Sequence, residues 1–196
     1  MPKRDDAYMR ARRETILDAA TTIVVEAGIG GLSMPVLCRA AGISMGGLYG
    51  HFPSKEAILV GIAERAAATR RGAIDPSSLS ALRDGIVALA RSPGTGEGRR
   101  LAQLDVEFVA AAGRDEAFAR SIGPVLLRHD LSRALDQLKL AGQVPESVDS
   151  GAVADKLTMV VAGRLYLVVA GMEVEGDVAD LLDLVIDETI GPVDLA

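Results

Sequence analysis

The sequence predicts an all-α protein of about nine helices, with a small N-terminal helical domain and a larger helical domain behind it. Apolar residues recur at helical spacing along most of the 196 residues, and capping signals separate the helical segments. Only 3% of the residues are aromatic, which disfavours a sheet-rich fold. A hydrophobic fraction of 49% supplies at least one sizeable core and excludes disorder.

The N-terminal segment predicts one long and one short helix. Apolar residues fall on one helical face over 8–27, and Gly28 supplies a left-handed stop. Ser33 is a natural N-cap, and Pro35 stands in the first turn, where its missing N–H is tolerated. The second helix is therefore expected to run to about Ala41.

Two further helices complete this predicted domain. Gly42 breaks the chain, and Ser44 can cap a second short helix that reaches Tyr49 or a little beyond. The pair Pro53-Ser54 marks the start of a longer helix over 55–71.

The larger domain follows the same pattern. Asp75-Pro76 predicts a helix start, and an apolar stripe continues to Leu89. The segment 92–98 is rich in Gly and predicts a mobile surface loop. Helical periodicity resumes over 101–112 and again over 115–138, where Gly123-Pro124 is expected to kink the helix.

The last two predicted helices are the most apolar. Residues 157–172 are nearly all apolar, but Arg164 lies near their middle and Asp155 and Lys156 flank them closely. An isolated central arginine is costly in lipid, so a buried helix is favoured over a membrane span. The final helix, 177–190, carries a broad apolar seam.

Charge is divided unevenly along the chain. The net charge is −6, yet residues 1–71 carry ten Lys and Arg against seven Asp and Glu, a net of +3, and residues 72–196 carry −9. This division indicates that only the N-terminal part approaches a polyanion, and chance clustering is the alternative. Cys38 has no disulfide partner, and the chain starts without an apolar signal segment, so a cytoplasmic location is expected.

The two short helices and their tight turn have the pattern of a helix-turn-helix. The run 16–59 includes Glu26-Ala27-Gly28, Ala41-Gly42-Ile43-Ser44 and the segment Leu48 to Glu56. Over about 50 residues it closely resembles the DNA-binding domain of the tetracycline-repressor (TetR) family. The resemblance implies a helix-turn-helix DNA-binding domain at 1–53, a connecting helix at 54–71 and a ligand-binding and dimerisation domain at 72–196.

The resemblance also implies the residues that contact double-stranded DNA. The start of the second short helix would face the major groove, through Ser44, Met45, Gly46 and Gly47. Phosphate contacts are expected from Tyr49, His51 and Lys55. Ser33 is expected to cap its helix, and contact with a phosphate is the alternative role for it. A cation in a first helical turn opposes the macrodipole at a cost of ~0.3–1 kcal/mol, so the position of Lys55 favours a bound phosphate; an idle exposed lysine is the alternative.

Base reading by this recognition helix is expected to be unusual. It has no Arg, Lys, Asn or Gln before Tyr49, so bidentate hydrogen bonds to guanine or adenine are absent from that segment. Specificity is therefore assigned to DNA shape and to three arginines near the start of the first helix, Arg10, Arg12 and Arg13. A solvated basic face is the equally weighted alternative for each of the three.

The same residues also contain a pattern that is typical of an enzyme. Gly42-Ile43-Ser44-Met45-Gly46 matches the G-x-S-x-G pattern of serine hydrolases, but that elbow requires a preceding strand. His51 and His129 are the only histidines, and one cysteine with two distant histidines forms no metal cluster. We therefore expect no enzyme, no metal and no cofactor, with a serine hydrolase as a remote alternative.

The larger domain is expected to hold a small-molecule pocket, because about 120 residues exceed what a dimer seam requires. For the apolar residues that could line this pocket, packing in the core is the alternative interpretation. For Arg164, an internal salt bridge is favoured over contact with an anionic ligand. The candidate lining residues are Phe108, Arg128, His129, Met159, Arg164 and Tyr166.

The family resemblance implies that the last two helices pair between two subunits. The predicted homodimer interface consists of Ala162, Gly163, Ala170, Gly171, Val178, Leu181, Leu182, Val185 and Ile186. The resulting hypothesis is a homodimeric repressor that a small lipophilic effector releases from a palindromic operator. A constitutive dimeric DNA-binding protein that senses no ligand is the main alternative.

Overall fold

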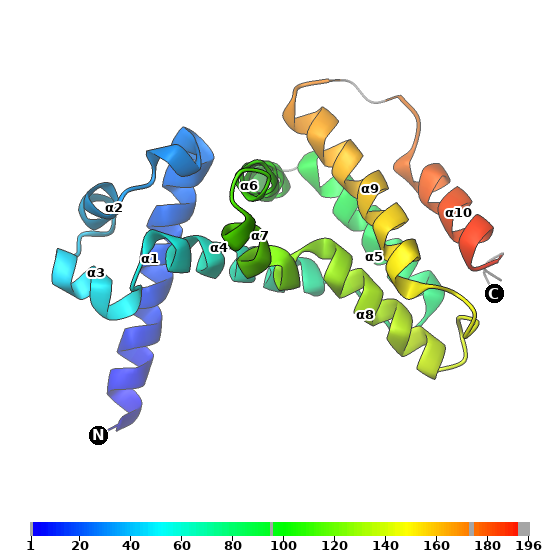
Figure 1. Ribbon diagram of the computed structural model, residues 1–196, viewed down its shortest axis with the longest axis horizontal. Coiled ribbons are helices and arrows are strands. Elements are labelled where there is room, and N and C mark those ends of the chain that lie inside the picture. Colours follow the sequence, from blue (N-terminus) through cyan, green and yellow to red (C-terminus); the bar gives the residue numbers. More distant parts are fainter. Residues whose placement is uncertain (1, 95, 173–174, 192–196) are drawn as a thin grey trace. The chain divides into compact units, whose positions relative to one another are not determined.

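The computed structural model describes residues 2–94, 96–172 and 175–191, and these residues form ten α-helices, two 3₁₀-helices and no strand (Figure 1). The predicted all-helical fold is confirmed. The helices are α1 (Pro2–Gly31), α2 (Met34–Ala41), α3 (Met45–His51), α4 (Lys55–Arg71), α5 (Leu79–Arg91), α6 (Gly96–Ala112), α7 (Glu116–Ile122), α8 (Leu127–Leu140), α9 (Ser150–Val169) and α10 (Val178–Thr189).

The chain divides into two compact units. The first comprises residues 1–65 and 103–122, and the second comprises residues 66–102 and 123–196. Helices α4 and α6 each contribute residues to both units, so two of the three boundaries between the units fall within helices.

The first unit is built around the N-terminal helices. Helix α1 packs against α2, and α2 packs against α3. Gly28 has a non-helical backbone with φ 71° at the predicted stop, although helical hydrogen bonding resumes to the end of α1. The fully buried side chains at its centre are Ile16, Leu37, Leu48, Phe52 and Ile58.

The second unit is centred on α9, which packs against α5, α8 and α10. Its core includes Leu82 and Ile86 from α5, Leu135 from α8, Leu157 from α9 and Leu182 from α10, each at most 1% exposed. One face of α9 is thus covered by three neighbouring helices, whereas Met159 and Tyr166 on another face are exposed, so the helix is only partly buried and not the buried helix that the sequence predicts. None of the described helices has the length and apolarity needed to cross a membrane.

The predicted mobile loop at 92–98 is wrong for the residues that the structure describes there. Residues Ser92–Gly94 form a 3₁₀-helix that packs against α5 and α9, and α6 begins at Gly96. Pro93 is buried, and the Ser92 hydroxyl donates a hydrogen bond to the Leu89 carbonyl at 2.8 Å. Tertiary packing supplies the order that the Gly-rich composition lacks.

Two other boundaries differ from the sequence expectation. The Asp75 carboxylate accepts the Ser77 N–H at 2.9 Å in a local turn, and α5 starts only after Ser78, whose hydroxyl accepts the Ala81 N–H at 3.0 Å. At Gly123-Pro124 the expected kink is a full break, because the 3₁₀-helix Gly123–Val125 separates α7 from α8. This break accounts for the tenth α-helix.

Candidate DNA interface and ligand pocket

The two short helices α2 and α3 are each capped by a serine, and a glycine ends α2 at the turn between them. The Ser33 hydroxyl accepts the Val36 N–H at 3.4 Å, and the Ser44 hydroxyl accepts the Gly47 N–H at 3.2 Å. Gly42 ends α2 with a left-handed backbone, φ 59°. Ser44 therefore serves as the N-cap of α3, following a helix and not the strand that a hydrolase elbow requires.

One face of α3 is open and the other is packed. Met45 and Tyr49 are 40% and 52% exposed, whereas Leu48 is fully buried. A Cβ atom at Gly46 would meet nothing within 4 Å, but one at Gly47 would lie 2.9 Å from Ile43 Cγ1. The exposed face thus consists of Ser44, Met45, Gly46 and Tyr49, a small surface that lets DNA approach the backbone closely.

Two of the three candidate arginines are engaged within the first unit. Arg12 donates from Nη2 to the Gly42 carbonyl at 2.7 Å, which ties α1 to the turn. Arg13 donates to the His51 carbonyl at 3.3 Å, and its guanidinium carbon lies 4.1 Å from the centroid of the Phe52 ring. These contacts give both arginines a structural role that neither predicted interpretation included.

Arg10, Ser33 and His51 complete the predicted DNA set. Arg10 and Ser33 are exposed, and the His51 side chain is half-buried. Arg10 makes no ion pair or side-chain hydrogen bond with a described residue, which leaves its guanidinium accessible.

Lys55 has a protein partner in the structure. Its Nζ donates to the Ile29 carbonyl at 2.6 Å, and the Glu107 carboxylate of α6 accepts the Ile29 N–H at 2.9 Å. The two side chains thus hold the same residue of α1 through its two backbone polar groups. This arrangement satisfies Lys55 without a phosphate, although two of its three N–H donors remain.

The six candidate ligand residues do not form a single pocket. Phe108 is buried in the first unit, with its ring centroid 6.1 Å from that of Phe118. In the second unit, Arg128 pairs with Asp155, which raises the pKa of the guanidinium. His129 and Tyr166 are exposed and do not line the pocket described next.

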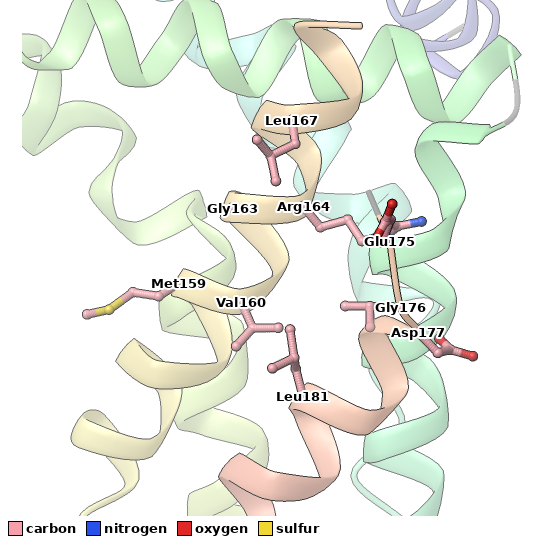
Figure 2. Close-up of a pocket in the computed structure, with 10 residues that line it drawn as sticks. Met159, Val160, Gly163, Arg164, Leu167, Glu175, Gly176, Asp177 and Leu181 are labelled. Carbon is pink, nitrogen blue, oxygen red and sulfur yellow. The ribbon is translucent and has the colours of Figure 1, made fainter. Parts of the chain in front are cut away.

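A pocket of about 250 Å³ lies on the face shared by α9 and α10 (Figure 2). Two of the predicted ligand residues, Met159 and Arg164, line it. Figure 2 shows Val160 and Leu181 pointing toward one another across its floor, and Arg164 extending from α9 toward the segment that carries Glu175.

The expected internal salt bridge of Arg164 is absent among the described residues. Its Nε and Nη1 atoms are buried and have no hydrogen-bond partner there. The neighbouring Asp177 is already engaged, because it accepts the Ala179 N–H at 3.0 Å and pairs with Arg91. These contacts lower the pKa of Asp177, and Arg164 adds a smaller electrostatic contribution in the same direction.

The predicted dimer residues separate into two groups. Val178, Leu182 and Ile186 are buried in the subunit core against α5 and α9, so their assignment to the interface is corrected. Val185 is half-buried and packs on the same core. The exposed members are Ala162, Gly163, Ala170, Gly171 and Leu181.

Some exposed residues of this face were not anticipated from the sequence. Leu184 of α10 is 64% exposed, and Met172, which follows α9, is 56% exposed. The helical spacing of Leu184 from Leu181 could have identified it. No sequence signal pointed to Glu107, because its partner is a backbone amide.

The capped turn and the open face of α3 have the arrangement of a helix-turn-helix. The sequence model described as "Bacterial regulatory proteins, tetR family" matches residues 16–62. This match spans α2, α3 and parts of α1 and α4, and it identifies this part of the chain as a TetR-family N-terminal helix-turn-helix domain. A match to bacterial regulatory proteins agrees with the expectation that the chain is not an enzyme.

Solved structures share the fold over nearly the whole chain. GusR of Salmonella enterica is 23% identical, with a TM-score of 0.71 over 90% of this chain and 94% of that one. SmeT of Stenotrophomonas maltophilia, the repressor of the multidrug efflux pump SmeDEF, is 23% identical, with a TM-score of 0.66 over 91% and 90%. The SmeT chain in a second structure, a complex with triclosan, is 22% identical, with a TM-score of 0.67 over 95% of this chain and 99% of that one. No curated protein sequence matches the chain.

Proposed function

We propose that this chain is a DNA-binding transcriptional regulator of the TetR family, and that it acts as a homodimeric, ligand-responsive repressor on a palindromic operator. The observation that carries the proposal is the open face of α3, where Met45 and Tyr49 are exposed beside the uncovered backbone at Gly46. Such a surface packs against base edges and methyl groups in the major groove more readily than it forms bidentate hydrogen bonds.

Dimerisation is supported by an apolar face on the second unit. Met159 and Tyr166 of α9 are 69% and 62% exposed, and Leu181 and Leu184 lie exposed on α10. Apolar side chains gathered on two neighbouring helices favour a covering partner. A second copy of the chain fits best, because two half-sites of a palindrome require two recognition helices related by a two-fold axis.

Ligand response is supported by the pocket on α9 and α10 and by the unpartnered atoms of Arg164. Among proteins of similar fold, SmeT is described as a repressor and has a solved structure of its complex with triclosan. By linkage, an effector that prefers the DNA-free conformation lowers operator affinity by the same factor by which DNA lowers effector affinity.

The test begins with selection of bound sequences from random duplex DNA. The expected motif is a palindrome whose half-site centres lie about one helical turn apart. Met45→Ala should relax selectivity at one position of each half-site by about 1 kcal/mol, because a thymine methyl loses its packing partner. A motif with one half-site, or an unchanged motif for the variant, would reject the respective part of the proposal.

A further inference from the structure

Arg164 stands out because it lies beside apolar side chains and forms no ion pair with a described residue, although it acts electrostatically on Asp177. Around it, the pocket is lined by Met159, Val160, Leu167 and Leu181. Two of its nitrogen atoms are buried without a hydrogen-bond partner in the described part of the chain. Desolvating a guanidinium without pairing it costs stability, so an anion from outside the subunit would stabilise this site.

The two carboxylates at the pocket do not supply that anion. Asp177 caps α10 through the Ala179 N–H and pairs with Arg91. Glu175 is exposed at the edge of the pocket and forms no ion pair with a described residue. The pocket therefore offers one unsatisfied cation beside an apolar surface.

We propose that this pocket binds a small organic carboxylate with an apolar body, whose carboxylate pairs with Arg164. A guanidinium donates in a planar fork that matches the two oxygens of a carboxylate. A volume of about 250 Å³ lies below the usual range for drug-sized ligands and suits a single-ring body. The apolar body would lie against Val160 and Leu181, which face each other in Figure 2.

The position of the pocket also connects its ligand to assembly. Gly163 and Leu181 line the pocket and belong to the exposed face that we propose for dimerisation. Occupancy is therefore expected to change the strength of the dimer. This regulatory consequence rests on the proposed function, whereas binding of the carboxylate does not.

Binding is tested on the full chain without DNA. Benzoate, salicylate and phenylacetate are titrated at up to millimolar concentration by calorimetry and thermal shift, with benzamide as the neutral counterpart of benzoate. At least one carboxylate should bind and raise the melting temperature, and benzamide should bind roughly tenfold or more weakly than benzoate because it lacks the charge-assisted pair. Equal binding of benzoate and benzamide, or no binding by any of the three acids, would overturn the proposal.

Matched variants locate the site. Arg164→Gln should lower the affinity for the carboxylate ligand by about tenfold or more. Arg133→Gln, at an exposed position of α8, should leave this affinity unchanged. Glu175→Gln should strengthen binding or leave it unchanged. Unchanged affinity in Arg164→Gln would reject the site.

Sedimentation of Arg164→Gln without ligand tests whether a second subunit, and not a small molecule, supplies the partner of Arg164. A weakened dimer would show that a carboxylate of the second subunit pairs with Arg164, and would overturn the small-molecule proposal. Operator titration with the bound acid then separates site from function. Arg164-dependent binding without operator release would retain the site and reject the regulatory role.

Discussion

The contact between Glu107 and Ile29 predicts that a carboxylate on α6 stabilises the end of α1. The Ile29 N–H donates to Glu107 at 2.9 Å, and the same residue's carbonyl accepts from Lys55 at 2.6 Å. Removing a charged acceptor from a partly buried donor costs about 1.5–3 kcal/mol. We expect the lower end of that range for Glu107→Ala, about 1.5 kcal/mol, because Ile29 is only half-buried.

Thermal and urea denaturation followed by circular dichroism measure this loss. For a chain of this length, about 1.5 kcal/mol corresponds to a fall of about 3–6 °C in melting temperature. Glu107→Gln should cost less, since its amide oxygen still accepts a hydrogen bond. Glu64→Ala, an exposed position of α4, provides the control and should stay within about 0.5 kcal/mol of the parent.

Hydrogen exchange at the Ile29 amide tests the same hydrogen bond directly. The amide should be protected in the parent and in Glu64→Ala, and should exchange faster in Glu107→Ala. If stability and the exchange rate of Ile29 are both unchanged in Glu107→Ala, the carboxylate does not stabilise the end of α1.

Three further predictions concern DNA binding, assembly and pH. Arg10→Gln should reduce the salt slope of operator binding by about one unit for each phosphate that a subunit no longer neutralises, and should leave folding stability unchanged. Arg12→Gln should instead cost about 1 kcal/mol of folding stability. Equal melting temperatures for the two variants would contradict this difference. Leu184→Glu should leave the helical spectrum intact but shift the protein toward monomer in light scattering, and an unchanged dimer would place the interface elsewhere. Arg83 holds the pKa of Asp183 below its usual range, so Asp183→Asn should lower folding stability by up to about 1 kcal/mol at neutral pH. This stability difference should vanish as the pH falls through the lowered pKa of Asp183. A stability difference that persists in acid would contradict the prediction.

The sequence predicted local structure well where a single residue determines the backbone. Gly42 and Ser44 mark the turn because a left-handed backbone and an N-cap each favour few residue types. The start of α5 was placed too early because Asp75-Pro76 has the chemistry of a helix start, and the choice between it and Ser78 depends on tertiary packing. The same holds for Pro93, whose burial orders a segment with the composition of a loop.

Side-chain roles in the candidate site were harder to predict because basic residues bind protein carbonyls and phosphates with the same donors. Arg12 and Lys55 were assigned to DNA, and both donate to backbone carbonyls within the first unit. Their acceptors, at Gly42 and Ile29, are 30 and 26 residues away in the chain. Sequence periodicity reports the face of a helix and does not identify such partners.

Helix α10 shows how one broad apolar seam can serve two different surfaces. Leu181 and Leu182 are adjacent, about 100° apart around the helix, so both fall within a stripe that the sequence assigns to one interface. The structure places Leu182 in the subunit core and leaves Leu181 and Leu184 exposed, while Arg83 of α5 pairs with Asp183. A glutamate at position 182 is therefore expected to unfold the second unit, whereas the same residue at position 184 is expected to weaken assembly alone, so a shift of two residues separates folding from dimerisation.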